Sequence, residues 1–240
     1  MLMKQKVCVV TGAASPQGIG NATARMLAAN GAHVALIDVS ANVGDAARKI
    51  AADHPASSIL AVECNIASPT ACEEATLKIK SAFNRVDALV HCAGIIRSGT
   101  YDKIDGKDFD EVIAVNLTGA FNIIRAFASM MVAQGNGSIV NIASVAGKEG
   151  NPNAPAYSAS KAALVSLMRS VALENKDHGI TANVILPGTM DTADNRKAMP
   201  GADTAQWVQP ASVASLIVWL AGDAGKDVTG AAIPVYGRGL

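Results

Sequence analysis

The chain has 240 residues, half of them hydrophobic, which is enough apolar material to bury the core of one large domain. Its twenty Lys and Arg residues balance its twenty Asp and Glu residues, so the net charge favours neither nucleic acid nor an anionic membrane as a partner. The apolar run at residues 7–10 is too short for a signal peptide, and the run at 214–222 is far shorter than the ~20 residues of a membrane span.

Four cysteines are spread along the chain, at Cys8, Cys64, Cys72 and Cys92. They lie in apolar surroundings and show no C-x-x-C spacing, so the sequence predicts buried, reduced thiols and no metal site. Reduced thiols without a signal peptide predict a cytoplasmic protein.

Short β-branched runs alternate with longer helical patterns along the whole chain. The sequence predicts strands at residues 7–10, 33–37, 59–63, 88–91, 138–142, 181–185 and 233–235, and helices at about 18–30, 42–53, 68–83, 107–134, 156–178 and 211–221. Each strand is too uniformly apolar to face solvent on one side, which indicates a parallel sheet covered on both faces. Right-handed crossovers then give a doubly wound α/β fold of about seven strands, with no linker to divide residues 1–240 into two domains.

Two of the predicted helices, at residues 107–134 and 156–178, are apolar on more than one side. A helix that covers a sheet needs a single apolar stripe, so the second face should be buried by something else. A second copy of the chain is the favoured cover, which predicts a homodimer or homotetramer through these helices. Deep burial within one large domain is the alternative, and it fits a three-layer fold less well.

Residues 11–20, TGAASPQGIG, connect the first predicted strand to the first predicted helix. This segment fits neither G-x-G-x-x-G nor G-x-x-x-x-G-K-[ST], yet glycines before a helix N-terminus allow a phosphate to approach backbone N–H groups. Gly12 would permit the sharp exit from the strand, and Gly18 and Gly20 would permit the close approach. A plain structural turn is the alternative.

Asp38 ends the second predicted strand, eighteen positions after Gly20. A carboxylate at about this distance from the loop is placed to accept a hydrogen bond from the adenosine ribose 2′-hydroxyl. It would repel a 2′-phosphate, and Val39 offers no positive charge, so the sequence predicts NAD(H) rather than NADP(H). The alternative role for Asp38 is a strand-end turn or a helix cap.

Tyr157 and Lys161 stand four residues apart at the start of a predicted helix and therefore share one face. A nearby ammonium favours the phenolate and lowers the pKa of a tyrosine from its ordinary value of ~10 toward neutrality, as a general acid/base requires. Ser144 ends the preceding strand at the same sheet edge, where its hydroxyl could bond a carbonyl or hydroxyl oxygen.

Together these segments resemble the short-chain dehydrogenase/reductase family along essentially the whole chain. The matching residues are Thr11, Gly12, Gly18, Gly20, Asp38, Asn65, Ile66, Ala93, Gly94, Asn116, Ser144, Tyr157, Lys161, Pro187, Gly188 and Thr192. The resemblance implies a Rossmann-type fold in which Tyr157 is the catalytic acid/base and Ser144 orients the substrate oxygen. Lys161 would lower the pKa of Tyr157 and bind the nicotinamide ribose. Asn116 would hold a water that links Lys161 to solvent, although a satisfied buried amide is the alternative for this residue.

The same resemblance implies an NAD(H) site that extends along the sheet edge. Its residues would be Gly12, Gln17, Gly18, Ile19, Gly20, Asp38, Asn65, Ile66, Ala93, Gly94, Tyr157, Lys161, Pro187, Gly188, Thr189 and Thr192. Asn65 and Ile66 would hold the adenine, and the segment after Pro187 would pass the nicotinamide carboxamide.

Three features depart from the family pattern. The glycine loop has five residues between TG and GIG, where three are usual, which indicates a two-residue insertion stiffened by Pro16. His91 stands where Asn is usual, and we interpret it as a structural or cofactor-facing residue rather than a second catalytic base. Tyr236 stands near the C-terminus where an acid is common.

The segment at residues 189–209 is polar and rich in helix breakers, which is typical of a mobile substrate lid. It offers Met190, Met199 and Trp207 for contacts, whereas Arg196 is expected to be a solvated surface residue. The segment also resembles the corresponding part of dihydropteridine reductases.

The predicted function is NAD(H)-dependent interconversion of a secondary alcohol and a ketone in a small-molecule substrate, with 3-oxoacyl-thioester reduction as the leading specific activity. A dihydropteridine-reductase-like NADH oxidoreductase is the enzymatic alternative. A catalytically silent nucleotide-binding scaffold is the alternative from another class, and the presence of Asn116, Ser144, Tyr157 and Lys161 argues against it.

Overall fold

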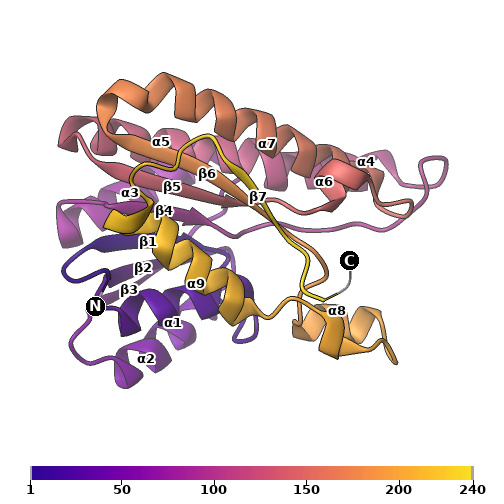
Figure 1. The fold of residues 1–240 in the computed structure, drawn as a ribbon, viewed down its shortest axis with the longest axis horizontal. Helices are drawn as coiled ribbons and strands as arrows, with labels where there is room; N and C mark the ends of the chain where they lie inside the picture. The colour runs from indigo at the N-terminus through magenta and orange to yellow at the C-terminus, as the bar shows by residue number, and fades with distance from the viewer. Residues whose placement is uncertain (1, 239–240) are drawn as a thin grey trace.

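A computed structural model gives the structure of residues 2–238. Its centre is a seven-stranded sheet in the order β3-β2-β1-β4-β5-β6-β7, in which all neighbouring strands are parallel (Figure 1). The chain runs outward from β1 to β3 and then returns to β4, which lies beside β1. In sheets of this kind, ligands bind at the carboxyl ends of the strands near this reversal.

All seven predicted strands are present. They are β1 (Val7–Thr11), β2 (His33–Asp38), β3 (Ile59–Glu63), β4 (Ala88–His91), β5 (Gly137–Ile142), β6 (Ile180–Pro187) and β7 (Ala232–Val235). Every residue of β1, β4 and β5 is buried, because helices cover both faces of the sheet. This explains why continuous apolar runs, rather than alternating ones, predicted these strands.

The helices form two outer layers (Figure 1). The apolar sides of α1 (Ile19–Ala29), α2 (Val43–Asp53) and α9 (Pro210–Ala221) share one core cluster with the side chains on one face of the sheet. On the other face, α3 (Pro69–Phe83), α5 (Gly119–Gln134) and α7 (Pro155–Asn175) share the second cluster. The observed architecture is therefore the doubly wound fold that the sequence predicts.

The helix predicted at residues 107–134 is not one regular helix. It consists of α4 (Gly106–Ile113), a π-helical turn (Ala114–Thr118) and α5. Residues 106–134 are long and apolar enough to cross a membrane by length and composition, but Ile123, Phe127 and Met131 are fully buried against the sheet. The run is thus a core helix of this fold, and the π turn divides it at Asn116.

Two short helices have no counterpart among the predicted ones. They are α6 (Ala146–Glu149), which follows β5, and α8 (Ala193–Ala198), which lies in the segment predicted as a lid. Neither is long enough to show the 3.6-residue periodicity from which helices are predicted.

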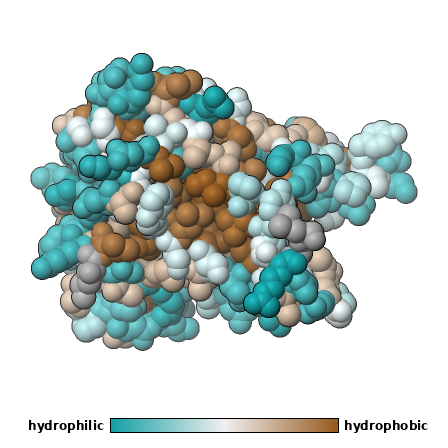
Figure 2. All heavy atoms as spheres, in the orientation of Figure 1, coloured by the Kyte–Doolittle hydropathy of each residue, from teal (hydrophilic) through white to brown (hydrophobic). Residues whose placement is uncertain are grey.

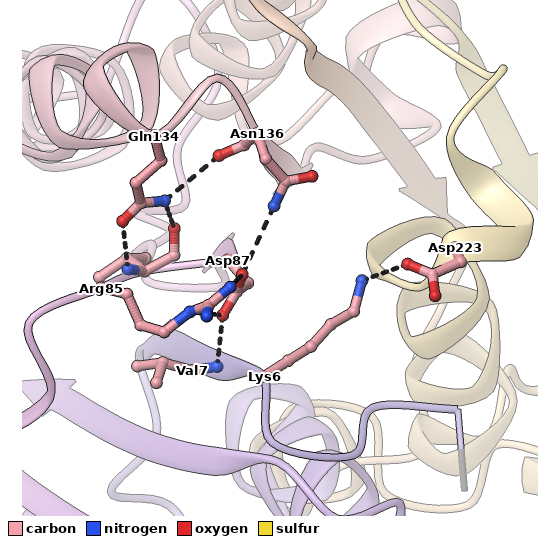
Figure 3. A network of polar contacts seen from close by, with 8 residues as sticks. Lys6, Val7, Arg85, Asp87, Gln134, Asn136 and Asp223 are labelled. Atoms are coloured by element: carbon pink, nitrogen blue, oxygen red, sulfur yellow. Dashed lines mark hydrogen bonds and ion pairs between the residues drawn. The ribbon is translucent and has the colours of Figure 1, made fainter.

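A polar network lies at the amino ends of the strands, on the side of the sheet opposite the candidate site (Figure 3). The Asp87 carboxylate is 3% exposed and accepts hydrogen bonds from the Val7 backbone N–H at 2.8 Å and from Arg85 Nη2 at 2.5 Å. Asn136 Nδ2 lies 3.4 Å from the same carboxylate. Because these residues stand at or just before the starts of β1, β4 and β5, the network ties the amino ends of three neighbouring strands together.

Large apolar side chains remain exposed on both outer layers. Phe121 and Val132 on α5 and Leu173 on α7 are 46%, 37% and 65% exposed. On the opposite layer, hydrophobic side chains gather over α9 and β7 (Figure 2), where Trp219 is 41% exposed and Pro234 is also exposed. The helix predicted at 107–134 therefore exposes apolar side chains at Phe121 and Val132, whereas α7 exposes one large apolar side chain, Leu173, among the described residues. A further apolar surface lies over α9 and β7.

Candidate active site

The glycine loop leads from β1 into α1 at the carboxyl edge of the sheet. Gly12 has a φ of +67°, and a Cβ there would lie 2.7 Å from the backbone N of Ala93. A Cβ at Gly20 would lie 2.3 Å from the Gly12 carbonyl oxygen. Only glycine fits these positions. The first turn of α1 has no acidic residue and no side-chain cap, so its N-terminal N–H groups suit an anion such as a phosphate.

The inserted residues of this loop form a turn of their own. The Gly18 N–H donates to the Ser15 carbonyl oxygen at 3.0 Å, which places Pro16 at the second position of a four-residue turn. The Ala14 N–H donates to Asp38 Oδ2 at 2.9 Å, so the loop is also tied to the end of β2. Gln17 is exposed at the turn. The predicted stiffening by Pro16 fits this geometry.

Asp38 makes the strand-end turn, which was the alternative role that the sequence left open, and it also holds the glycine loop. Its Oδ1 accepts from the Ser40 N–H at 3.0 Å, which is the strand-end turn, and its Oδ2 accepts from Ala14. A carboxylate offers about four acceptor positions, and the residue is only partly buried. Asp38 therefore keeps acceptor capacity for a ribose hydroxyl.

Asn65 and Ile66 follow β3, whose last residue pairs in register with Asp38. Asn65 Oδ1 accepts from the Ala67 N–H at 3.0 Å, and the Ile66 carbonyl accepts from Asn122 Nδ2 at 3.0 Å. The fold thus brings this predicted adenine pair to the same edge as Asp38 and holds its backbone in place.

Tyr157, Lys161 and Ser144 come together where α7 passes the end of β5. Lys161 Nζ lies 5.5 Å from the centroid of the Tyr157 ring. The Ser144 hydroxyl accepts from the Ala146 N–H at 3.2 Å and donates to the Pro187 carbonyl at 3.5 Å, and it lies near enough to Tyr157 to lower the pKa of the phenol. Close contact between α6 and α7 supports this arrangement, because a Cβ at Gly147 would lie 2.7 Å from the Ala162 backbone N. The structure therefore brings together the three groups that the sequence predicts at one site.

Burial controls the protonation of Lys161 and Tyr157. Lys161 is 4% exposed and donates to the Ile142 carbonyl at 2.8 Å, and burial lowers its pKa to about 8. Burial raises the pKa of Tyr157, while the Ser144 hydroxyl lowers it in part. The net direction is opposite to the predicted lowering by Lys161. The ammonium lies over the ring, 5.5 Å from its centroid, and donates its hydrogen bond to the Ile142 carbonyl and not to the phenol oxygen.

Asn116 lies in the π-helical turn and is fully buried. Its Oδ1 accepts from the Ile95 N–H at 2.8 Å, and its Nδ2 donates to the Ile95 carbonyl at 2.9 Å and to Ser160 Oγ at 3.1 Å. The side chain is a satisfied buried amide, which was the alternative interpretation. A Cβ at Gly94 would lie 3.2 Å from Asn116 Oδ1 and 3.3 Å from Lys161 Nζ, so Asn116 also lies close to the lysine that it was predicted to serve.

His91 ends β4 and braces the glycine loop. Thr11 Oγ1 accepts hydrogen bonds from the Cys92 and Ala93 N–H groups, both at 3.2 Å. The Thr11 hydroxyl therefore donates its own proton to His91 Nδ1, at 2.8 Å. This arrangement requires a neutral imidazole, and burial lowers the pKa of His91 to about 3. The contacts support the structural interpretation of His91 over a second base.

The end of β6 brings the remaining predicted cofactor residues to the site. The Pro187 carbonyl accepts from the Val145 N–H at 3.1 Å, and the Gly188 N–H donates to the Val235 carbonyl at 2.9 Å. Thr192 caps α8 by accepting from the Asn195 N–H at 3.3 Å. Its hydroxyl proton stays available to a ligand, so capping does not remove it from the predicted site.

A cavity of about 490 Å³ lies against Val145, the residue that follows Ser144. It is lined by Val145, Glu149, Gly188, Thr189, Gln206, Trp207 and Tyr236. The Tyr236 hydroxyl donates to Glu149 Oε1 at 2.6 Å, across 87 positions of sequence. Sequence reasoning missed Glu149 and Gln206. The only local signal for Glu149 was its position five residues after Ser144, on the loop that leaves the same sheet edge.

The predicted lid residues take different positions. Trp207 lines the cavity, whereas Met199 is 40% exposed and is not part of its lining. Arg196 is exposed as predicted, but it is not simply solvated, because it makes a bidentate pair with Asp191 at 2.6 and 2.9 Å.

The chain is similar to known oxidoreductases over its whole length. A sequence profile described as short chain dehydrogenase matches residues 6–202. The 3-oxoacyl-[acyl-carrier-protein] reductase FabG of Thermotoga maritima is 35% identical, over 99% of this chain and 98% of its own.

Two solved structures extend the comparison. An NAD⁺-bound xylitol dehydrogenase has a TM-score of 0.91 and 28% identity, over 99% of this chain and 100% of its own. L-sorbose reductase from Gluconobacter frateurii, complexed with NADPH and L-sorbose, has a TM-score of 0.90 and 26% identity, over 98% of this chain and 96% of its own.

Proposed function

The chain belongs to the short-chain dehydrogenase/reductase family, and on that premise we propose that it is an NAD(H)-dependent enzyme that interconverts a secondary alcohol and a ketone. Its relatives are reductases and dehydrogenases, and this chain is an oxidoreductase of the same kind, acting on carbonyl or alcohol groups. The observation that carries the proposal is the meeting of Ser144, Tyr157 and Lys161 beside a cavity at the carboxyl edge of the sheet.

The residues at this edge fit the nicotinamide cofactor that the family binds. Gly12 and Gly20 let the loop pack closely on the backbone around it. The loop then leads into the uncapped start of α1, where a pyrophosphate would lie. The solved relatives bind NAD⁺ in one case and NADPH in another, so the family alone does not select between them. The free acceptor capacity of Asp38 supports NAD(H), because a carboxylate there repels a 2′-phosphate.

The proposed mechanism assigns proton transfer to this chain's own residues. When bound, the nicotinamide supplies or accepts the hydride. Ser144 Oγ hydrogen-bonds the substrate oxygen, and Tyr157 Oη donates its proton to that oxygen in reduction and accepts it in oxidation. With its pKa lowered to about 8, Lys161 can release and recover a proton near neutrality, which fits the proton relay expected of Lys161.

Two substrate classes have support. Sequence similarity to the Thermotoga enzyme supports 3-oxoacyl-thioester reduction as one class. Sugar alcohols and ketoses are the second class, on the basis of the xylitol and L-sorbose enzymes and of the carboxylate of Glu149 in the cavity wall. The presence of Ser144 disfavours a pterin reductase.

The test of the acid/base assignment is Tyr157→Phe, which removes one oxygen atom. We expect kcat to fall by about 10²- to 10⁴-fold, the usual contribution of a general acid/base, while NADH binding measured by fluorescence titration persists. Tyr101→Phe is the matched control, because Tyr101 is 88% exposed. Unchanged turnover in Tyr157→Phe would refute the assignment.

We also propose a cytoplasmic homotetramer. The exposed apolar side chains of α5 and α7 suit one symmetric interface, and those over α9 and β7 suit a second. Two different interfaces of this kind build a tetramer, whereas one builds a dimer. Light scattering after size-exclusion chromatography at micromolar concentration tests the proposal. A monomer in this measurement would contradict it.

A further inference from the structure

We infer that the cavity next to Val145 binds a small substrate with a second hydroxyl group near its reacting carbon, as a polyol or a ketose has, and that Glu149 and Tyr236 bind this hydroxyl. The inference rests on the proposed function, since it takes Ser144 and Tyr157 as the groups that hold the reacting oxygen.

The first argument is position. Val145, which follows Ser144, lines the cavity, and Glu149 lines it one turn of α6 further along. Four residue steps separate Val145 from Glu149, and at the rise of an α-helix they advance the backbone by ~6 Å along the axis. That distance matches a short polyol lying along the cavity wall.

The second argument is the chemistry of the acceptor. Tyr236 donates to Glu149 Oε1 at 2.6 Å, and it is the only hydrogen-bond partner of the Glu149 side chain within residues 2–238. No Lys, Arg or His of the same residues forms a salt bridge with Glu149. The remaining carboxylate positions can only accept, so they select a donor such as a hydroxyl. They would repel a carboxylate or a phosphate on the substrate.

The third argument is the chemistry of two other residues that line the cavity, Gln206 and Trp207. Gln206 offers a donor and an acceptor, and Trp207 offers an aromatic surface to C–H groups. A polyol presents both kinds of group along its carbon chain. Glu149 is exposed to solvent, and a 3-oxoacyl chain presents only methylene groups to it, so such a substrate gains no hydrogen bond from this carboxylate.

The experiment compares three substrates with the wild-type enzyme. These are xylitol and butan-2-ol for NAD⁺-dependent oxidation, and an acetoacetyl N-acetylcysteamine thioester for NADH-dependent reduction. We expect kcat/KM for xylitol to exceed that for butan-2-ol by about tenfold or more, since a hydrogen bond to a charged group is worth at least that factor. A kcat/KM for the thioester above that for xylitol would overturn the inference.

Glu149→Gln tests the residue itself, because it removes the charge and keeps the shape. We expect the ratio of kcat/KM for xylitol to that for butan-2-ol to fall about tenfold, and kcat/KM for the anion 3-hydroxybutyrate to rise relative to wild type. Tyr236→Phe should lower the same ratio. The control is Glu174→Gln on the exposed end of α7, which should keep the wild-type ratio. A ratio that Glu149→Gln leaves unchanged would overturn the inference.

Failure of the proposed function has a different signature. In that case the wild-type enzyme binds NADH but turns over none of the three substrates. If only the inference fails, activity on butan-2-ol or the thioester remains, without a preference that depends on Glu149.

Discussion

The buried ammonium of Lys161 should make the protein less stable than it would be with an apolar residue at this position. Lys161 is 4% exposed, and burial lowers its pKa from 10.5 to about 8. We therefore predict that Lys161→Met, which has similar length and no charge, yields a more stable but inactive protein.

The magnitude follows from the pKa. The lowering from 10.5 to about 8, at ~1.4 kcal/mol per pKa unit, corresponds to about 3 kcal/mol of destabilisation when both states are protonated. Methionine also loses the hydrogen bond to the Ile142 carbonyl, which costs ~1 kcal/mol. The net gain in the free energy of unfolding should be about 2 kcal/mol at pH 7.

The pH dependence has a definite sign. Below pH 8 the lysine is protonated in both states, and the full cost is present. Between pH 8 and 10.5 the folded state loses its proton first, so the stability of the wild-type protein rises relative to the variant. Above pH 10.5 both states are neutral, and the advantage of methionine has disappeared.

Urea unfolding of the wild-type protein and the variant, measured from pH 6.5 to pH 10 without cofactor, checks this prediction. Other titrating groups are common to both proteins and cancel in the difference. Lys78→Met on the exposed side of α3 is the control, and it should stay within about 0.5 kcal/mol of wild type. A Lys161→Met protein that is less stable at pH 7, or a difference that does not change with pH, would show that the ammonium is not desolvated as the structure implies.

Two further predictions concern the opposite edges of the sheet. Asp38→Ala should lower the preference for NAD over NADP at least tenfold in kcat/KM, because it removes the charge that repels a 2′-phosphate, and should loosen the loop that Asp38 holds through Ala14. Equal use of the two cofactors by the wild-type enzyme would contradict this role. Asp87→Ala should lower the free energy of unfolding by about 3 kcal/mol, since it leaves the Val7 N–H and the Arg85 guanidinium without their buried partner. A loss below about 1 kcal/mol in urea unfolding would mean that the network in Figure 3 contributes little.

The sequence predicts the sheet well because each strand is buried on both faces. A strand that is buried on both faces needs apolar residues at nearly every position. A run such as Val7–Thr11 meets this need within a few adjacent residues and can therefore be recognised in the sequence. The Tyr157–Lys161 pair is predictable for a similar reason, since one helical turn relates the two residues. In both cases the determining interaction is local in sequence.

The π turn at Asn116 lies beyond such reasoning. The residues around it form a good helix by composition, but Asn116 bonds the backbone of Ile95 and the hydroxyl of Ser160. These partners lie 21 and 44 positions away in sequence. The π turn occurs where Asn116 makes these contacts, and the contacts form only when α4, α5 and α7 have packed together.

The sequence by itself determined the parallel fold, the glycine positions of the first loop and the family of the enzyme. Apolar runs, glycines and a one-turn spacing each depend on residues that are close together in the chain. Only the tertiary structure decided which direction the pKa of Tyr157 takes and which residues form the wall of the cavity next to Val145. Burial depends on everything packed around a group, and the contact between Glu149 and Tyr236 joins positions 87 residues apart. Neither property can be read from neighbouring residues along the chain.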